Sequence, residues 1–296
     1  MKILITGSNG QLGNELQKIV ATGTAEIGSV SEEIKNSEVF AMDVDTLDIT
    51  NLEQVKRVLN EIKPTVVINC AAATNVDGCE ANQDLAFKIN SLGPRNLAMV
   101  CEEIGAKIVQ VSTDYVFSGV GETPLKESDL VAPVSVYGKT KLLGEEFVRD
   151  FSSKYYIVRT SWVFNINGKN FIETMLRLSK ANNQLSIVND QIGSPTYTKD
   201  LSRLLVDMLE TSKYGLYHAT NEGYCSWYEF ANTIFKLANI NIDIKAINSN
   251  EYASRAKRPM NSKLSKDKLI EYGFKPLPHW EDALKDYLIR RGDLLI

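Results

Sequence analysis

Short apolar runs alternate with amphipathic segments through the first half of the sequence, and this alternation constrains the fold more than any other feature. The runs are rich in β-branched residues and lie at 2–6, 38–42, 65–69, 107–112 and 155–159. Helical periodicity separates them, as at 51–62, where apolar residues recur on one face after a capping asparagine. Strands that alternate with helices form a parallel sheet covered on both faces. We therefore predict an α/β fold with a doubly wound parallel sheet of the Rossmann type.

The second half of the sequence changes character. Helices are predicted at 171–180, 200–211 and 226–239, around a polar, turn-rich stretch at 189–196. We predict a dinucleotide-binding domain over 1–161 and a smaller substrate-binding region over 162–296, with a soft boundary and segments that cross back. A stripe at helical spacing in the third of these helices, 226–239, predicts a core-facing side. It comprises Trp227, Phe230, Ile234 and Leu237. A long helix at 82–103 is expected to be interrupted at Gly93-Pro94.

Composition excludes several classes of function. The 296 residues carry a net charge of −4 with the two signs interspersed, so we expect neither a nucleic-acid nor a membrane partner. The apolar run at the N-terminus is too short for a signal peptide. Four cysteines form no CxxC pair, and two histidines are too few for a His-rich metal site. We expect a cytoplasmic protein without a resident metal.

A glycine turn follows the first predicted strand. Gly7, Gly10 and Gly13 form the spacing GxxGxxG where the chain opens a helix. Glycines let the backbone approach a pyrophosphate, and a helix N-terminus offers free N–H groups and a positive dipole end. The turn predicts a dinucleotide site, although a glycine turn between strand and helix is also common structure.

Asp43 follows the second predicted strand. A carboxylate there accepts hydrogen bonds from the adenosine ribose, although it lies thirty residues beyond Gly13, farther than usual. The alternative is that Asp43, Asp45 and Asp48 only form turns. No lysine or arginine lies between residues 36 and 55. A 2′-phosphate would therefore be repelled, which favours NADH at least as much as NADPH.

Tyr137 and Lys141 are four residues apart in a predicted helix and share one face. A lysine ammonium stabilises a phenolate, so we expect Lys141 to lower the pKa of Tyr137 and make it a workable proton donor to a carbonyl oxygen. Thr113 follows the strand at 107–112, at the edge where ligands of open parallel sheets bind, and can donate a hydrogen bond to that oxygen. Each of these motifs alone is frequent by chance. Their order along the chain, however, predicts a nicotinamide site.

These motifs resemble the extended short-chain dehydrogenase/reductases, and among them the dTDP-4-dehydrorhamnose reductases. The resemblance runs from Met1 to about Trp280 and is carried by Ser112–Gly119 (STDYVFSG), Val136–Leu142 (VYGKTKL), Arg159–Phe164 (RTSWVF), Asp190–Thr196 (DQIGSPT), Arg258-Pro259 and Asn261-Ser262.

The resemblance implies hydride transfer from NADH or NADPH to C4 of a 4-keto hexose attached to a nucleotide. Tyr137 would protonate the oxygen, Lys141 would hold the nicotinamide ribose, and Thr113 would orient the carbonyl. It implies sugar contacts from Thr113, Asp114 and Trp162. It also implies cofactor contacts from Gly10, Gln11, Leu12, Asp48, Ile49, Ala72, Ala73, Thr74 and Val111.

We add Arg258 as a diphosphate contact, because its planar cation suits a phosphate; a structural surface role is the alternative. Two features depart from the resemblance. Ala73 stands where a polar residue is expected, which puts one cofactor contact in doubt. Some family members dimerise around magnesium, and of their acidic residues only Glu15 is matched here. A homodimer is therefore compatible with the sequence, but a magnesium-bound one is not indicated.

A 4,6-dehydratase is disfavoured, because Tyr115 stands where its glutamate base would be. Other enzymes of the same superfamily, a second nucleotide-sugar reductase or an epimerase, and a non-catalytic binding module stay open. A 4-epimerase would keep its nucleotide bound, whereas a reductase exchanges it. The sequence also resembles the regulatory subunit of methionine adenosyltransferase, which uses the same fold as a binding module.

Overall fold

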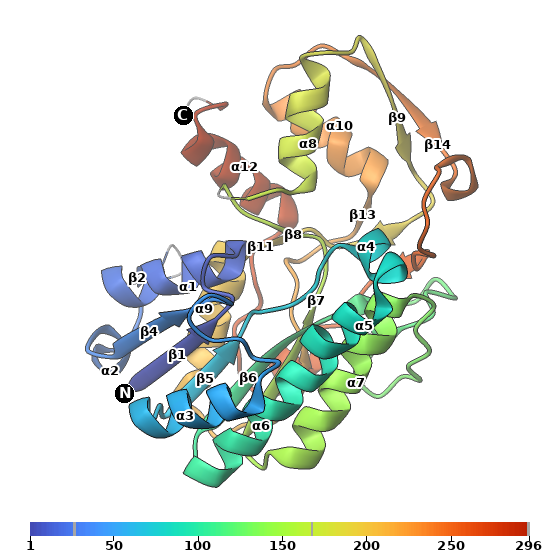
Figure 1. Cartoon of the computed structure of the whole chain (residues 1–296). Helices are drawn as coiled ribbons and strands as arrows, with labels where there is room; N and C mark the ends of the chain where they lie inside the picture. The colour runs from blue at the N-terminus through green and yellow to red at the C-terminus, as the bar shows by residue number, and fades with distance from the viewer. Residues whose placement is uncertain (26–27, 167, 295–296) are drawn as a thin grey trace.

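The computed structural model describes residues 1–25, 28–166 and 168–294, and it forms two lobes (Figure 1). The larger lobe is built on a parallel sheet with helices on both faces. The smaller lobe gathers helices α8, α10 and α12 with a narrow two-stranded sheet (Figure 1). The predicted fold class is confirmed.

The strands are β1 (Lys2–Thr6), β2 (Thr24–Ala25), β3 (Gly28–Ser29), β4 (Glu38–Met42), β5 (Val66–Asn69), β6 (Lys107–Thr113), β7 (Tyr155–Thr160), β8 (Val163–Phe164), β9 (Gln184–Val188), β10 (Ile192–Gly193), β11 (Thr196–Tyr197), β12 (Gly215–His218), β13 (Cys225–Ser226), β14 (Asp243–Ile247) and β15 (Asn261–Ser262). The helices are α1 (Gln11–Thr22), α2 (Glu32–Lys35), α3 (Leu52–Ile62), α4 (Val76–Ala81), α5 (Gln83–Phe87), α6 (Gly93–Ile104), α7 (Val136–Phe151), α8 (Phe171–Ser179), α9 (Thr198–Leu209), α10 (Trp227–Leu237), α11 (Asp267–Glu271) and α12 (Trp280–Arg291), with a π-helix η1 (Lys88–Leu92) and 3₁₀ turns η2 (Asp114–Val116) and η3 (Ser249–Glu251).

The main sheet has the strand order β12-β7-β6-β5-β1-β4, and every neighbouring pair is parallel. Its central strands are buried on both sides, which explains why their sequences are continuously apolar instead of alternating. All six strands therefore end at the same edge of the sheet. After β1 the chain first forms β4 on one side of it and then β5 on the other side, so the strand order reverses at β1. The loops after β1 and β5 therefore diverge and leave room for a ligand.

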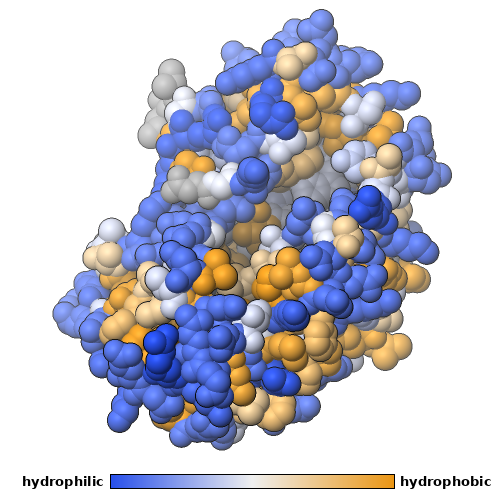
Figure 2. Space-filling view, viewed as in Figure 1, coloured by the Kyte–Doolittle hydropathy of each residue, from blue (hydrophilic) through white to orange (hydrophobic). Residues whose placement is uncertain are grey.

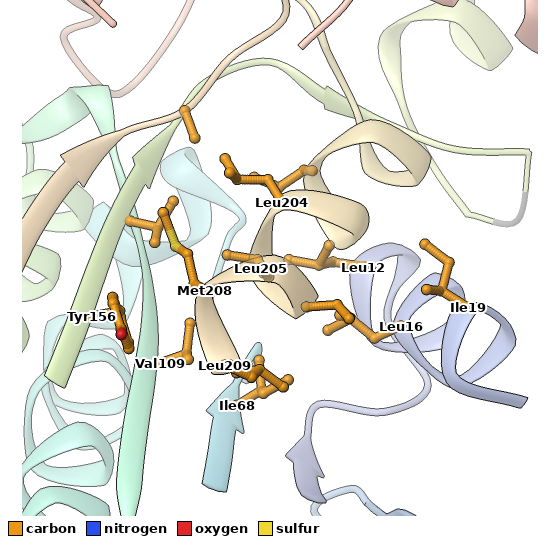
Figure 3. Close-up of a cluster of buried hydrophobic side chains, with 14 of the residues drawn as sticks. Leu12, Leu16, Ile19, Ile68, Val109, Tyr156, Leu204, Leu205, Met208 and Leu209 are labelled. Atoms are coloured by element: carbon orange, nitrogen blue, oxygen red, sulfur yellow. The ribbon is translucent and has the colours of Figure 1, made fainter. Parts of the chain in front are cut away.

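One face of the sheet is covered by α1 and α9. Figure 3 shows side chains of α1 meeting those of α9 above the sheet residues Ile68, Val109 and Tyr156. Leu16, Leu205 and Leu209 are fully buried there. This contact fixes the start of α1, and with it the glycine turn, against the sheet.

Helices α3, α6 and α7 cover the other face. Asn51 caps α3 by accepting the N–H of Gln54 at 3.1 Å, and Ser135 caps α7 by accepting the N–H of Gly138 at 3.1 Å. The expected interruption near Gly93-Pro94 is found as a π-helix that ends at Leu92, directly before it. α6 begins at Gly93 with Pro94 in its first turn, where a missing N–H costs nothing.

Gly93 is small for a packing reason, because a Cβ there would lie 2.5 Å from Cδ1 of Ile49. That contact joins α6 to the segment before α3.

The smaller lobe has a separate aromatic-rich core that includes Phe164, Phe230, Trp280 and Tyr287. The predicted stripe on α10 faces this core: Phe230 and Ile234 are buried in it, and Trp227 and Leu237 pack against it. Trp227 also lines a cavity. Helix α9 and strand β12 come after the predicted boundary at 161 and return to the larger lobe. Among the described residues, no helix combines the length and apolar composition that crossing a membrane requires.

Candidate active site

The glycine turn packs tightly at the edge where β1 ends. Gly7 adopts the left-handed conformation with φ +63°, and a Cβ on it would lie 2.6 Å from the backbone nitrogen of Ala71. A Cβ on Gly13 would lie 2.4 Å from the carbonyl oxygen of Gly7. Gly10 donates its N–H to that same carbonyl at 3.0 Å. The turn therefore presents bare backbone at the N-terminus of α1, which fits a pyrophosphate.

Gln11 and Leu12 follow the turn, but their side chains point to protein. The Gln11 side chain accepts the N–H of Asn165 at 2.8 Å and links α1 to the smaller lobe. Leu12 is buried in the core under α9. A cofactor contact from Leu12 would have to use its backbone.

Asp43 holds backbone at the neighbouring strand end. Its carboxylate accepts the N–H groups of Asn9 at 2.9 Å and Val44 at 2.8 Å. It therefore ties the glycine turn to β4, as the turn-forming alternative requires. Its free lone pairs leave the contact with a ribose as a prediction.

Asp48 and Ile49 flank the same strand end. The Asp48 carboxylate accepts the N–H of Thr50 at 2.9 Å, and Ile49 is buried against Gly93. Both residues shape the segment beside β4, and their predicted contacts with adenine stay predictions.

Ala72, Ala73 and Thr74 form the loop after β5, beside the glycine turn. The side chain of Asn90 holds this loop: its Oδ1 accepts the N–H of Ala73 at 2.8 Å, and its Nδ2 donates to the carbonyl of Ala73 at 3.1 Å. Asn90 of η1 therefore fixes the loop, and the cofactor contact expected at position 73 stays a prediction.

Asn90 was missed by the sequence analysis. Its Nδ2 also donates to Oγ1 of Thr140 on α7 at 3.2 Å, so it connects the loop to the helix that carries Tyr137. The sequence signal was the Gly93-Pro94 irregularity, because π-turns occur often at functional sites.

Thr113 and Tyr137 come together at the ends of β6 and the start of α7. A hydrogen bond with Thr113 lowers the pKa of the Tyr137 phenol, but burial is the larger effect and raises that pKa above its ordinary value. Lys141 is not among the groups that shift this pKa, so the expected lowering by Lys141 is not seen; burial raises the pKa most, and the nearby Asp114 adds to the rise. A phenol with a raised pKa keeps its proton through the neutral range but is a weaker acid than a free tyrosine, so it gives that proton only to a strongly basic oxygen such as an alkoxide.

Lys141 lies one turn further along α7 and is buried. Its Nζ donates to the carbonyl of Val111 at 2.6 Å. Burial lowers the pKa of the amine to about 8, while Glu145 raises it. Lys141 thus sits between β6 and the glycine-turn edge, where a nicotinamide ribose is expected.

Beneath Lys141 lies a buried ion pair. Arg159 donates to both carboxylate oxygens of Glu145, at 2.9 Å and 2.7 Å, and Ser112 donates to the same carboxylate. This network joins β6, β7 and α7 through Ser112, which precedes Thr113, and through Glu145, one helical turn from Lys141. Neither Glu145 nor Arg159 was singled out as a functional residue from the sequence.

Asp114 and Tyr115 extend the site toward the smaller lobe. Thr113 donates to Oδ1 of Asp114 at 2.9 Å, and burial raises the pKa of Asp114 to about 6. The rings of Tyr115 and Tyr137 meet edge to face, with centroids 5.5 Å apart. Tyr115 also lines a cavity of about 980 Å³, so it stands between the proton donor and that cavity.

This cavity opens between the two lobes, where Figure 2 shows the molecule hollowed. Apolar residues of α8 and β9 form one wall. Arg255, Lys257 and Arg258 contribute positive charge to another. Among the lining residues that the structure describes there is no carboxylate, so the cavity favours an anionic ligand.

Trp162 joins the catalytic edge to this cavity. Its backbone is left-handed, with φ +48°, and its ring stacks on that of Trp227 with centroids 3.6 Å apart. Gly193 lies against the indole, since a Cβ there would be 2.8 Å away. Contacts from α10 and β10 therefore hold one unfavourable backbone conformation in place. Trp227 is a site residue that the sequence analysis assigned to the core.

Glu15 is buried among positive groups. Its carboxylate lies 3.8 Å from Nη1 of Arg290 and 3.6 Å from Nζ of Lys18, and it accepts the amide of Asn165 at 3.2 Å. An arginine therefore already balances the carboxylate that relatives were expected to use for magnesium. In the described part of the chain, no group of three or more His, Cys, Asp or Glu side chains is placed to hold a metal ion.

The fold and the site define a class. A Rossmann-type sheet with a bare glycine turn, and with threonine, tyrosine and lysine at the adjoining strand ends, is the arrangement of a nicotinamide-dependent oxidoreductase of the short-chain dehydrogenase/reductase type. The chain belongs to the family described as RmlD substrate binding domain, whose profile matches residues 1–291.

Individual relatives match over nearly the whole chain. The spore coat polysaccharide biosynthesis protein SpsK of Bacillus subtilis (strain 168) is 40% identical and covers 98% of each sequence. The crystal structure of a dTDP-4-dehydrorhamnose reductase from Clostridium acetobutylicum ATCC 824 is 46% identical with a TM-score of 0.93, covering 99% of this chain and 100% of that one. The dTDP-4-dehydrorhamnose reductase from Bacillus anthracis str. Ames, solved in complex with NADP, is 42% identical with a TM-score of 0.90, covering 98% and 99%.

Proposed function

We propose that this chain reduces the C4 keto group of dTDP-4-dehydro-L-rhamnose to the alcohol of dTDP-L-rhamnose, with NADH or NADPH as the reductant. Family membership supports the reaction class. The observation within the structure that carries the proposal is the meeting of Thr113, Tyr137 and Lys141 at the sheet edge, beside a cationic cavity.

The reduced nicotinamide, when bound, supplies the hydride that adds to C4. The Tyr137 hydroxyl gives its proton to the C4 oxygen as negative charge builds there. The Thr113 hydroxyl donates a hydrogen bond to the same oxygen and stabilises that charge. Lys141, held by the carbonyl of Val111, binds the ribose next to the nicotinamide. One ketone, one hydride and one proton give one secondary alcohol.

The remaining groups position the two ligands. The glycine turn of Gly7, Gly10 and Gly13 fits the pyrophosphate of the cofactor because only backbone lines it. Asp114 and Trp162 border the sugar position. Arg258 and its basic neighbours face the diphosphate of the substrate, which the lack of carboxylates in the described cavity lining supports.

Turnover provides the test. The purified protein with NADPH and dTDP-4-dehydro-L-rhamnose should lose the absorbance of the reduced nicotinamide, one equivalent per sugar reduced. An epimerase would leave the nicotinamide with no net change in absorbance. A binding module resembling the regulatory subunit of methionine adenosyltransferase would show no turnover. A D-configured 4-keto sugar nucleotide serves as the comparison substrate. If the protein reduces it faster, that sugar becomes the proposed substrate in place of dTDP-4-dehydro-L-rhamnose.

Further parts of the proposal concern the setting of the enzyme. We place the reaction in the cytoplasm, in keeping with four unpaired cysteines. We assign the dinucleotide to residues 1–161 and most of the substrate contacts to 162–296, and we propose that any homodimer forms without magnesium. Because Arg290 balances Glu15, EDTA should leave both activity and assembly unchanged.

A further inference from the structure

Asp77, in the first turn of α4, faces a segment far away in the sequence. This segment, residues 252–258, contains the three cations of the cavity wall and is called the basic strap here. The strap has no helix or strand. Oδ1 of Asp77 accepts the backbone N–H groups of Arg255 at 3.0 Å and Ala256 at 2.8 Å, and Oδ2 accepts Nη2 of Arg258 at 2.8 Å.

Asp77 is the attachment point of the strap. Tyr252, at the start of the strap, donates its N–H to the carbonyl of Ser249 at 3.2 Å. Among the described residues, every hydrogen bond that ties the rest of the strap to another element ends on Asp77. The other bonds of this stretch are internal, from Ser254 and Arg258 to the carbonyl of Ala256. Most of the strap is exposed, so little burial replaces these bonds if they are lost.

The three contacts have two different effects. Two backbone bonds fix the path of the strap, and the ion pair fixes the guanidinium of Arg258. The side chains of Arg255 and Lys257, in contrast, form no ion pair within the described structure, and both line the cavity. A fixed strap therefore directs unpaired cations at the place where an anionic ligand enters.

We propose that Asp77 is a positioning residue that holds the basic strap as the anion-binding wall of the cavity, and so sets the affinity for the substrate's diphosphate. The inference rests on the proposed function for the identity of that anion. Asp77 does not touch the reacting atoms, and its effect is on substrate binding, with the proton-transfer groups left in place.

Two substitutions separate its contacts. Asp77→Ala removes all three, whereas Asp77→Asn keeps an acceptor for the two backbone N–H groups and removes the ion pair. Asp84→Asn, on exposed α5, is the matched control because it removes the same charge from a neighbouring helix. Hydrogen bonds to charged groups stabilise more than neutral ones, and Asp77→Ala loses three of them. We therefore expect the KM for the nucleotide sugar to rise about 10- to 100-fold in Asp77→Ala.

The rise should be only a few-fold in Asp77→Asn and absent in Asp84→Asn. kcat, NADPH affinity and the melting temperature should stay near their wild-type values in all three, a separation that a general loss of structure would not give. An unchanged KM in Asp77→Ala, or a fall in kcat equal to the rise in KM, would overturn the inference.

Limited trypsinolysis of the ligand-free protein tests the tether without relying on the substrate. Trypsin cuts after Arg255 and Lys257 but cuts poorly before Pro259. Cleavage at the first two sites should be faster in Asp77→Ala than in the wild type, and added dTDP should slow it. Equal cleavage rates would refute the tether even if the enzyme turns over, whereas absent turnover with faster cleavage would refute only the proposed function.

Discussion

The basic strap lines the cavity directly, whereas the catalytic edge reaches it through Tyr115, and the two regions are built in opposite ways. Thr113 and Lys141 come from β6 and α7, are buried, and rest on the ion pair of Glu145 with Arg159. The strap has no regular structure and is tied to the larger lobe through one carboxylate. Proton transfer needs groups fixed to a fraction of an ångström, and regular elements with buried support provide that. Recognition of a flexible, charged diphosphate tolerates an exposed loop.

This difference predicts that changes at the edge act on kcat and changes in the strap act on KM. The largest effect is expected for Tyr137→Phe. The change removes the proton donor but keeps the ring against Tyr115, so kcat should fall by about 10²- to 10⁴-fold. Affinity for NADPH, measured by fluorescence titration, should be nearly unchanged. A variant that reduces the keto sugar at close to the wild-type rate would contradict the mechanism and favour the binding-module alternative.

Thr113→Val should act on the same parameter with a smaller effect. Loss of one hydroxyl that serves the C4 oxygen should lower kcat on the order of 10- to 100-fold. Thr113→Ser keeps the hydroxyl and is the control, with a rate expected near that of the wild type. If Thr113→Val changed KM and left kcat unchanged, Thr113 would act in substrate binding. The assignment of kcat effects to the catalytic edge would then be wrong.

Arg258→Gln tests the strap side. The guanidinium is the planar cation closest to the tether, and its removal should raise KM for the nucleotide sugar roughly 10-fold while kcat stays within about twofold. Arg258→Lys should recover part of the loss, since it keeps the charge but not the planar fork. A loss confined to kcat would show that the strap takes part in the chemical step.

The smallest effect is expected from pH. The pKa of Lys141 is lowered to about 8, so the amine loses its proton as pH rises through that value. kcat/KM should therefore fall about fivefold between pH 8 and 9, as the protonated fraction falls from about one half to one tenth. The same limb should persist in the residual activity of Tyr137→Phe, because the tyrosine pKa is raised. Disappearance of the limb in that variant would assign it to Tyr137.

Local patterns predicted the edge, because its residues lie close together in the sequence. The strand at 38–42 has the observed bounds of β4, and the four-residue spacing of Tyr137 and Lys141 places both on α7. The direction of the tyrosine pKa could not be predicted in this way. It depends on burial in the folded chain, and Lys141, four residues further along the helix, does not contribute to the shift.

Long-range contacts were beyond the reach of these patterns. Asp77 meets Ala256 across a separation of 179 residues, and nothing in the sequence around either residue indicates the other. Trp227 shows the same limit, because its helical spacing with Phe230 is typical of a core stripe. Its stacking on Trp162 depends on how two lobes meet.

The return of α9 and β12 to the larger lobe has a consequence for how the protein is made. β12 pairs with residues 156–159 of β7, and Leu205 and Leu209 of α9 fill the space above Ile68 (Figure 3). On the ribosome, β7 therefore emerges as an open edge strand, with an apolar face uncovered, until residues 198–218 follow. The nascent chain must pass through a stage with an unpaired strand and exposed leucine partners, which is when edge-to-edge association is most favoured.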